Sequence, residues 1–285
     1  MSKRVAMAAG AKRPPDPSVP VAGDPDYMLS LARGLSVIRA FADGRPHLTV
    51  ADAARITGMS RAAARRCLYT LSVLGYAASI DGAYTLTPAV LALGYTYIGS
   101  TSLARVAQPV LERVSDQLHE SSSVAVLDGE EIVYVARAAA RRILAISLEV
   151  GSRLPAACTS MGRVLLAAAD ADERARFLRR VKLPRYTART ITDKAALAAE
   201  LDAVRAQGYA VVDQELELGL RSCAVPIARR DGTVVAALNV GAHAARADAT
   251  TLRREIVPLL RKAADEIGAA LGTPRELGEP AGRIA

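Results

Sequence analysis

Hydroxyl and guanidinium side chains gather on one face of a predicted helix near the N-terminus. They follow the turn Gly58-Met59 at helical spacing, which brings them onto one side of the helix. Such groups hydrogen-bond phosphate oxygens and base edges in a DNA major groove. An ordinary solvated helix face would show the same pattern, and that alternative stays open here. The face comprises Ser60, Arg61, Arg65, Arg66, Tyr69 and Thr70, and the candidate DNA contacts are Thr49, Ser60, Arg61, Ala62, Arg65, Arg66 and Tyr69.

A second set of polar side chains falls at the ends of predicted elements in the C-terminal part of the chain. In "AACTSMGR" a loop enters a helix that Ser160 or Thr159 would cap, leaving the amides of Met161, Gly162 and Arg163 free. Free amides and the positive end of a helix dipole attract a carboxylate. The segment therefore predicts an anionic ligand, although a capping serine is structural in most proteins.

Further residues would complete this pocket. Cys158, Met161 and Cys223 are polarizable enough to line the body of an aromatic or short aliphatic acid. Asp213, Glu215, Arg221 and Asn239 could orient its polar groups, although Arg221 is equally suited to an ion pair with Glu215 or Glu217. The predicted effector-binding residues are Cys158, Thr159, Ser160, Met161, Asp213, Arg221, Cys223 and Asn239.

The usual signatures of enzymes are missing from the sequence. There is no GxSxG, GxxxxGK[ST] or HExxH motif, and no GxGxxG follows a strand. The three cysteines and three histidines are scattered without the spacing of a metal site, and no CxxC pair exists. We therefore expect no catalytic residues, no cofactor, no bound metal and reduced thiols.

The elements that carry the first set form a helix-turn-helix pattern. Apolar residues at helical spacing predict a helix from Tyr27 to Phe41. Thr49 and Asp52 form an acidic capping box for a second helix that stops at Gly58, and Ser60 caps a third. Ala54 and Gly58, both small, are expected to let the second and third helices cross closely. Asp81-Gly82 is a hairpin turn signal, which completes a winged helix.

The elements that carry the second set predict an α+β domain with an antiparallel sheet. A linker helix over 88–102 precedes a helix over 103–119, and alternating runs predict hairpins that turn at Asp128-Gly129 and Asp231-Gly232. A third strand is expected within 142–151. Helical patterns cover 160–180, 193–210 and 250–271. Strands and helices segregate as they do in α+β folds and not in doubly wound nucleotide folds.

Composition and charge fit this division. The net charge is +8, and residues 1–87 hold 11 Lys and Arg against 6 Asp and no Glu, a basic balance that suits a polyanion partner. Apolar runs are too short for a membrane span and no signal peptide is evident, so we expect a cytoplasmic protein. The expected domains are a disordered tail (1–26), the winged helix-turn-helix (27–87), the linker helix (88–102), an effector-binding domain (103–272) and a flexible tail (273–285).

The order of several segments resembles the IclR family of bacterial regulators over residues 27–271. These are "LTVADAARITGMSRAAARRCLYTLSVLGY", "LPAACTSMGRVLLAA", "YAVVDQELELGLRSCAVPI" and "VVAALNVGA". Within the family, "CTSMGRVLLA" and "DQELELGLRS" are most similar to the subgroup of PcaR, PcaU and PobR. Those are regulators of the β-ketoadipate pathway that respond to protocatechuate, 4-hydroxybenzoate or β-ketoadipate.

The resemblance implies a winged helix, a linker helix and a GAF-like effector domain with a non-catalytic pocket. It places the effector site at 158–161, Asp213, Cys223 and Asn239, and the recognition helix at 60–70. It also implies a homodimer or a dimer of dimers. Ala62, Ala63 and Ala64 stand where family members often carry hydroxyl and β-branched residues, which leaves the operator sequence open.

These observations together predict a ligand-responsive activator of aromatic-acid catabolism genes. Its partners would be double-stranded operator DNA, a small aromatic or carboxylic acid and, for activation, RNA polymerase. A dimer would set two recognition helices about 34 Å apart, and the acid would shift their spacing through the linker helix. The alternative within the family is a repressor that responds to a non-aromatic small carboxylic acid. Two alternatives from other functional classes are an enzyme that acts on a small acid and a protein-interaction module that binds neither DNA nor a ligand.

Overall fold

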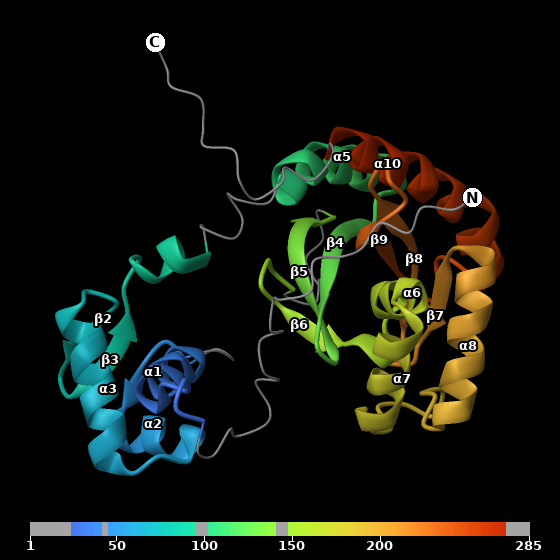
Figure 1. The fold of residues 1–285 in the computed structure, drawn as a ribbon. Helices are drawn as coiled ribbons and strands as arrows, with labels where there is room; N and C mark the ends of the chain where they lie inside the picture. The colour runs from blue at the N-terminus through green and yellow to red at the C-terminus, as the bar shows by residue number, and fades with distance from the viewer. Residues whose placement is uncertain (1–23, 42–44, 95–101, 141–147, 272–285) are drawn as a thin grey trace, which may run out of the picture. The chain divides into compact units, whose positions relative to one another are not determined.

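The computed structural model describes residues 24–41, 45–94, 102–140 and 148–271. The chain divides into two compact units, Met1–Tyr95 and Thr96–Ala285 (Figure 1). The predicted tails over 1–26 and 273–285 lie outside the described residues, apart from residues 24–26.

The N-terminal unit is a three-helix bundle with a small sheet. The predicted hairpin is confirmed, with its turn at Asp81-Gly82, and a two-residue strand joins it in the order β1-β3-β2. That strand was not predicted, because two residues are too few to show an alternating pattern. The elements are α1 (Leu29–Arg39), β1 (Leu48–Thr49), α2 (Val50–Thr57), α3 (Arg61–Val73), β2 (Ala77–Ile80) and β3 (Ala83–Leu86).

The turn between α2 and α3 forms as its capping residues predict. Thr49 and Asp52 make the full capping box, and the Ser60 hydroxyl accepts from the amide of Ala63 at 3.2 Å. Gly58 ends α2 with φ 69°, a left-handed conformation that favours glycine. A Cβ built at Gly58 would meet nothing within 4 Å, so the expected close helix crossing at this residue is wrong. The backbone conformation, and not lack of space, is what requires glycine here.

The segment between the units is described only in part. Residues 90–94 are helical, and the next helix is α5 (Ser102–Leu118). The rest of the predicted linker helix, 95–101, lies outside the described residues. So does most of the strand that the sequence predicts within 142–151.

The C-terminal unit is built on a six-stranded, fully antiparallel sheet. The strand order is β6-β5-β4-β9-β8-β7, so the two predicted hairpins pair with each other through β4 and β9. The first hairpin turns at Gly129-Glu130, one residue later than predicted. The strands are β4 (Ser121–Asp128), β5 (Glu131–Ala138), β6 (Arg153–Pro155), β7 (Ala210–Asp213), β8 (Leu220–Ala228) and β9 (Val234–His243).

Helices cover both faces of this sheet (Figure 1). On one face α5 packs with α10 (Val257–Ala270), and their apolar stripes meet alternate strand residues such as Cys223, Val225 and Leu238. On the other face α6 (Ser160–Ala168) lies against the sheet, backed by α7 (Ala171–Arg180) and α8 (Lys194–Gln207). The result is a three-layer α+β domain, which confirms the predicted fold class.

Two predicted helix boundaries are wrong. The helix expected over 160–180 is two helices, because the Asp170 side chain accepts from the amide of Glu173 and starts a new one. The helix expected over 193–210 ends at Gln207, because Gly208 adopts φ 74° and the chain turns into β7. The last helical stretch runs as predicted but contains a π-helical segment, Leu252–Ile256, between Ala249–Thr251 and α10.

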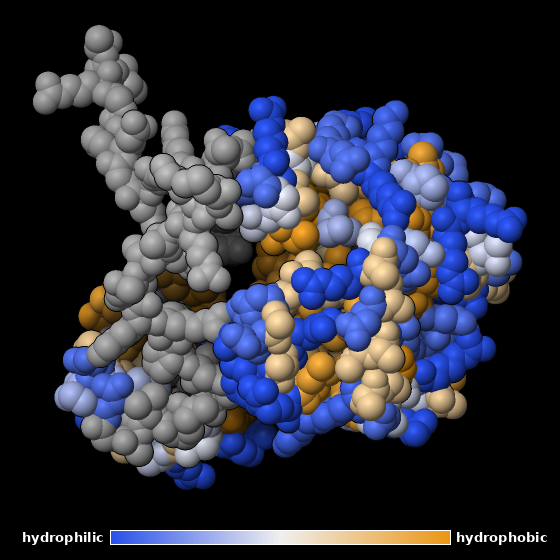
Figure 2. Space-filling model, turned by 45° about the vertical axis from the view of Figure 1, so that its right-hand side comes forward, coloured by the Kyte–Doolittle hydropathy of each residue, from blue (hydrophilic) through white to orange (hydrophobic). Residues whose placement is uncertain are grey.

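The surface is mainly hydrophilic on the side that Figure 2 shows, with hydrophobic residues between charged ones. Among the residues that the structure describes, no helix is long and apolar enough to cross a membrane.

One glycine is essential to the layer that holds α6. A Cβ on Gly162 would lie 2.1 Å from the backbone oxygen of Ala156. Because the contact is with backbone and not with a flexible side chain, relieving it requires the backbone to shift. We expect Gly162→Ala to lower the free energy of unfolding by at least about 1–3 kcal/mol in urea denaturation. Gly34→Ala in α1, where a Cβ meets nothing within 4 Å, is the control and should leave stability unchanged or slightly raised. Equal effects of the two changes would show that the close approach does not matter.

Candidate functional site

Five of the seven predicted DNA-contacting residues lie on the exposed face of α3, while Ser60 caps α3 and Thr49 caps α2. Arg61, Ala62, Arg65, Arg66 and Tyr69 are all exposed, and Tyr69 keeps 66% of its surface. In the part of the chain that the structure describes, none of the three arginines has an ion-pair partner. Their guanidinium groups are therefore available to an external anion.

The two capping hydroxyls of this region have local partners. The Thr49 hydroxyl donates to the Asp52 carboxylate at 2.6 Å, and the Ser60 hydroxyl accepts from an amide of α3. Hydrogen bonds from Thr49 lower the pKa of the exposed Asp52 carboxyl below its usual value. The Thr49 and Ser60 hydroxyls therefore cap the N-termini of α2 and α3. A role for either hydroxyl in DNA contact stays a prediction.

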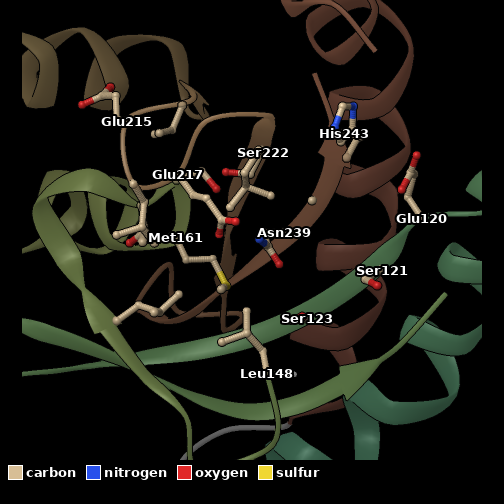
Figure 3. Close-up of a pocket in the computed structure, with 18 of the residues that line it drawn as sticks. Glu120, Ser121, Ser123, Leu148, Met161, Glu215, Glu217, Ser222, Asn239 and His243 are labelled. Atoms are coloured by element: carbon tan, nitrogen blue, oxygen red, sulfur yellow. The ribbon is translucent and has the colours of Figure 1, made fainter. Parts of the chain in front are cut away.

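The C-terminal unit contains a cavity of about 520 Å³ on the α6 side of the sheet (Figure 3). This volume lies within the range of small-molecule sites. Residues from β4, β5, β8, β9, the start of α6 and the loop 214–219 form its walls. The lining residues used below are Glu120, Ser123, Tyr134, Arg137, Cys158, Thr159, Ser160, Met161, Glu215, Glu217, Ser222, Asn239, His243 and Arg246.

Five of the eight predicted effector residues line this cavity and three do not. Cys158, Thr159, Ser160, Met161 and Asn239 lie in its wall, brought together from α6 and from β9. The other three, Asp213, Arg221 and Cys223, lie outside it.

The alternation of side chains along β7 and β8 explains this separation. Cys223 is fully buried in the core on the α5 and α10 face, while its neighbour Ser222 lines the cavity. Asp213 and Arg221 are direct register partners on the two strands. Asp213, Arg221 and Cys223 therefore lie on the face of the sheet away from the cavity, unlike their neighbours Val212 and Ser222.

Asp213 and Arg221 form an ion pair of their own. Arg221 Nε donates to Asp213 Oδ1 at 2.8 Å, and Arg189 also pairs with this carboxylate. These arginines hold the pKa of Asp213 below its usual value, with Arg221 the main cause. The predicted ion pair of Arg221 thus exists, although its partner is Asp213 and not Glu215 or Glu217.

The start of α6 offers fewer free amides than the sequence predicts. Thr159 is the N-cap, and its hydroxyl accepts from the Gly162 amide at 3.3 Å. Its carbonyl accepts from the Arg163 amide at 3.0 Å. Of the three amides that were expected to meet a ligand, two are therefore occupied within the protein.

Two polar atoms in the cavity wall have no partner. They are Ser160 Oγ and Asn239 Oδ1, both buried and without a hydrogen bond to any described residue. The exposed fractions of Ser160 and Asn239 are 1% and 9%. Because an unpaired buried polar group costs about 1–3 kcal/mol, these two atoms are candidates to hydrogen-bond a bound molecule.

The sequence analysis missed the polar side chains that β4 and β5 contribute. In the sheet register, Arg137 lies opposite Ser123, and Ser123 lies opposite Asn239. The three residues therefore form one row across β5, β4 and β9, and all of them line the cavity. The alternation of residues along each strand could have indicated these side chains, because every second residue of a strand points to the same face of the sheet.

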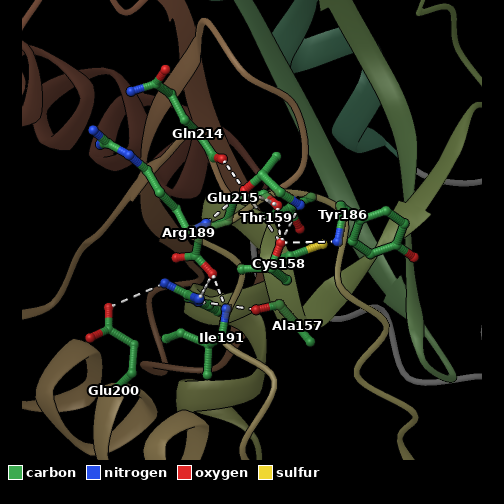
Figure 4. Close-up of polar contacts among 12 residues, drawn as sticks. Ala157, Cys158, Thr159, Tyr186, Arg189, Ile191, Glu200, Gln214 and Glu215 are labelled. Atoms are coloured by element: carbon green, nitrogen blue, oxygen red, sulfur yellow. Dashed lines mark hydrogen bonds and ion pairs between the residues drawn. The ribbon is translucent and has the colours of Figure 1, made fainter.

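A buried ion pair holds the loop that closes one side of the cavity. Arg163 Nη2 donates to Glu215 Oε2 at 2.6 Å, and Arg163 is only 2% exposed. The Ile191 amide donates to the same carboxylate oxygen at 3.1 Å, and Thr190 donates to the Glu215 carbonyl at 2.6 Å (Figure 4). Arg163 also reaches Glu200 at 3.5 Å. Contacts from α6 and the loop 187–191 thus converge on Glu215, and α8 contacts the same Arg163 through Glu200.

Burial favours the neutral form of two ionisable groups in the cavity wall. Burial raises the pKa of the Cys158 thiol to about 11 and that of the Tyr134 phenol to about 12. On the other face, burial raises the pKa of Cys223 to about 12. No group of described His, Cys, Asp and Glu side chains is arranged to hold a metal ion.

Comparison with known proteins places the two units in one family. Residues 30–80 match the IclR helix-turn-helix domain, and residues 95–269 match the bacterial transcriptional regulator IclR C-terminal domain. The chain is 51% identical over 246 residues to the Pca regulon regulatory protein of Pseudomonas putida, covering 86% of this chain and 84% of that protein. It is 38% identical over 247 residues to the p-hydroxybenzoate hydroxylase transcriptional activator of Acinetobacter baylyi, covering 85% and 91%.

A solved structure supports the same relation. An IclR homolog from Microbacterium hydrocarbonoxydans, crystallised with 4-hydroxybenzoate, superimposes with a TM-score of 0.73 at 30% identity. The match covers 85% of this chain and 98% of that one. The chain therefore belongs to the IclR family of bacterial transcriptional regulators, and it is similar to a Pca regulon regulatory protein and to a p-hydroxybenzoate hydroxylase transcriptional activator.

Proposed function

We propose that this protein activates genes of aromatic-acid catabolism when 4-hydroxybenzoate, protocatechuate or a related acid occupies the cavity of its C-terminal unit. The observation that carries this proposal is the pair of unpaired buried atoms, Ser160 Oγ and Asn239 Oδ1, in a cavity of ligand size. The names of the relatives supply the ligand class. They favour an aromatic acid over the alternative of a repressor that responds to a non-aromatic acid.

The proposed effector site combines predicted and newly found residues. Cys158, Thr159 and Met161 would contact the ring or its edge, and Ser160 and Asn239 would hydrogen-bond its polar groups. Binding without turnover is the expected activity, because a thiol with a pKa of about 11 stays protonated near neutral pH and is a poor nucleophile. Asp213, Arg221 and Cys223 would act only through the packing of β7 and β8.

The helix-turn-helix unit would bind operator DNA as part of a homodimer or a dimer of dimers. Two recognition helices, the α3 helices of two subunits, would enter successive major grooves about 34 Å apart. Support for self-association comes from α1, which exposes large apolar side chains at Leu29, Leu31 and Leu35. Activation adds RNA polymerase as a further partner, as the name of the Acinetobacter relative suggests.

A pair of serine variants tests the ligand site. Ser160→Ala removes an unpaired hydroxyl, so the melting temperature of the free protein should be unchanged or higher. The stabilisation by 4-hydroxybenzoate in a thermal-shift assay should fall, because one ligand hydrogen bond is lost.

Ser122→Ala is the matched control, one position away from the cavity residue Ser123. Its hydroxyl is fully buried and donates to the Leu111 carbonyl at 2.8 Å. This change should lower the melting temperature and leave the ligand-induced shift intact. Wild-type protein that is not stabilised by hydroxybenzoates would contradict the proposal, and so would a Ser160→Ala protein with a full ligand response.

Arginine variants of α3 test the DNA interface. Arg65→Ala or Arg66→Ala should weaken binding to DNA from upstream of the protein's own gene in a fluorescence anisotropy titration. If the side chain meets a phosphate, the slope of log affinity against log salt should fall by about 1. If it meets a base, the loss should be largest on the operator and small on random DNA, about 1–3 kcal/mol. Arg153→Ala, an exposed arginine of the C-terminal sheet, should change neither quantity.

A further inference from the structure

Arg137 is a cation in the cavity wall that lacks a counter-ion. It lies on β5, is partly buried and lines the cavity. Its guanidinium donates to the Ser123 hydroxyl at 3.1 Å, and Ser123 itself is only 1% exposed. Among the described residues, no carboxylate forms an ion pair with Arg137.

The other arginine of the cavity wall, Arg246, has a carboxylate partner, which sets Arg137 apart. Arg246 pairs with Glu120 at 2.9 Å, and Arg163 pairs with Glu215. Burial lowers the pKa of the Arg137 guanidinium. The only nearby group that opposes this effect among the described residues is the Tyr134 phenol, and no carboxylate contributes. The adjoining segment 141–147, which the structure does not describe, contains no Asp or Glu that could supply one. A buried charge without a partner is costly, so the site favours an anion from outside the protein.

The opposite end of the same polar row offers acceptors. Asn239 Oδ1 lies two strands away from Arg137 and has no donor. Figure 3 shows the Glu217 side chain extending from the loop 214–219 toward Asn239, and no described residue pairs with its carboxylate. A carboxylate and an amide oxygen attract hydroxyl donors and repel an anion. Two amides at the start of α6 are also taken by Thr159.

We propose that Arg137 binds the carboxylate of the ligand, held in place by Ser123, and that Asn239 and Glu217 accept from a hydroxyl group at its other end. This inference rests on the proposed function and reverses the orientation that the helix terminus suggests. The ligand class is then an acid with a hydroxyl group across a short rigid body from its carboxylate. Arg137 selects the charge and Glu217 selects the hydroxyl group.

The carboxylate end is tested with a charged ligand and its neutral analogue. Isothermal titration calorimetry at neutral pH compares 4-hydroxybenzoate with 4-hydroxybenzamide on the full chain. The wild-type protein should prefer the acid by about 10- to 100-fold, the value of one charge-assisted hydrogen-bonded contact. Arg137→Gln should bind the amide as the wild type does and reduce the preference to less than about threefold. Arg137→Lys, which keeps the charge, should retain part of the preference.

Arg153→Gln is the control, because Arg153 lies on the neighbouring strand β6 but pairs with Asp128 and Glu131 outside the cavity. It should keep the wild-type preference. If Arg137→Gln keeps that preference as well, or loses the amide together with the acid, the inference is overturned while the proposed function stands. If the wild type binds neither compound nor any other hydroxybenzoate, the proposed function falls too.

The hydroxyl end is tested with benzoate, which lacks the donor. The wild type should bind 4-hydroxybenzoate more tightly than benzoate, and Glu217→Ala should reduce this difference by about tenfold. Glu130→Ala, an exposed glutamate in the β4–β5 turn, should not alter it. An unchanged difference in Glu217→Ala would place the hydroxyl group elsewhere and overturn this half of the inference.

Discussion

The six-stranded sheet of the C-terminal unit has to satisfy two different environments at once. One of its faces packs against α5 and α10, where most of the buried side chains are apolar, and the other meets α6 and the cavity. Because successive strand residues point to opposite faces, each strand alternates between core residues and cavity residues. Ser222 and Cys223 show the effect directly: one lines the cavity and the other is fully buried on the far side. This constraint sorts polar from apolar residues and so defines the site.

Local chemistry explains why much of the fold could be predicted from the sequence. Capping residues and turn glycines act on the backbone within a few residues. The helix starts at Thr49 and Ser60 and the hairpin at Asp81-Gly82 can therefore be predicted from the local sequence alone. The two main hairpins of the sheet follow from alternation for the same reason. The break between α6 and α7 was readable too, since Asp170 is an ordinary N-cap, but the apolar periodicity on either side of it concealed the break.

The site was less predictable, because it depends on which face of a strand each residue takes. The sequence places Asp213, Arg221 and Cys223 beside residues that line the cavity, but it does not show that their own side chains lie on the opposite face of the sheet. The row of Arg137, Ser123 and Asn239 depends on the register of three strands. One of them, β9, is distant in sequence from the hairpin of β4 and β5. The ion pair of Arg163 with Glu215 joins residues 52 positions apart. Only tertiary structure brings these groups together.

The regulatory account requires that the cavity and the DNA-binding helix influence each other. A ligand can alter DNA binding only if it prefers one arrangement of the subunits, and the coupling must then act equally in both directions. The most direct test is the affinity for 4-hydroxybenzoate, measured by calorimetry on the full chain with and without saturating operator DNA. We expect operator DNA to change this affinity by about 5- to 150-fold. An affinity that is the same in both conditions would contradict the coupling.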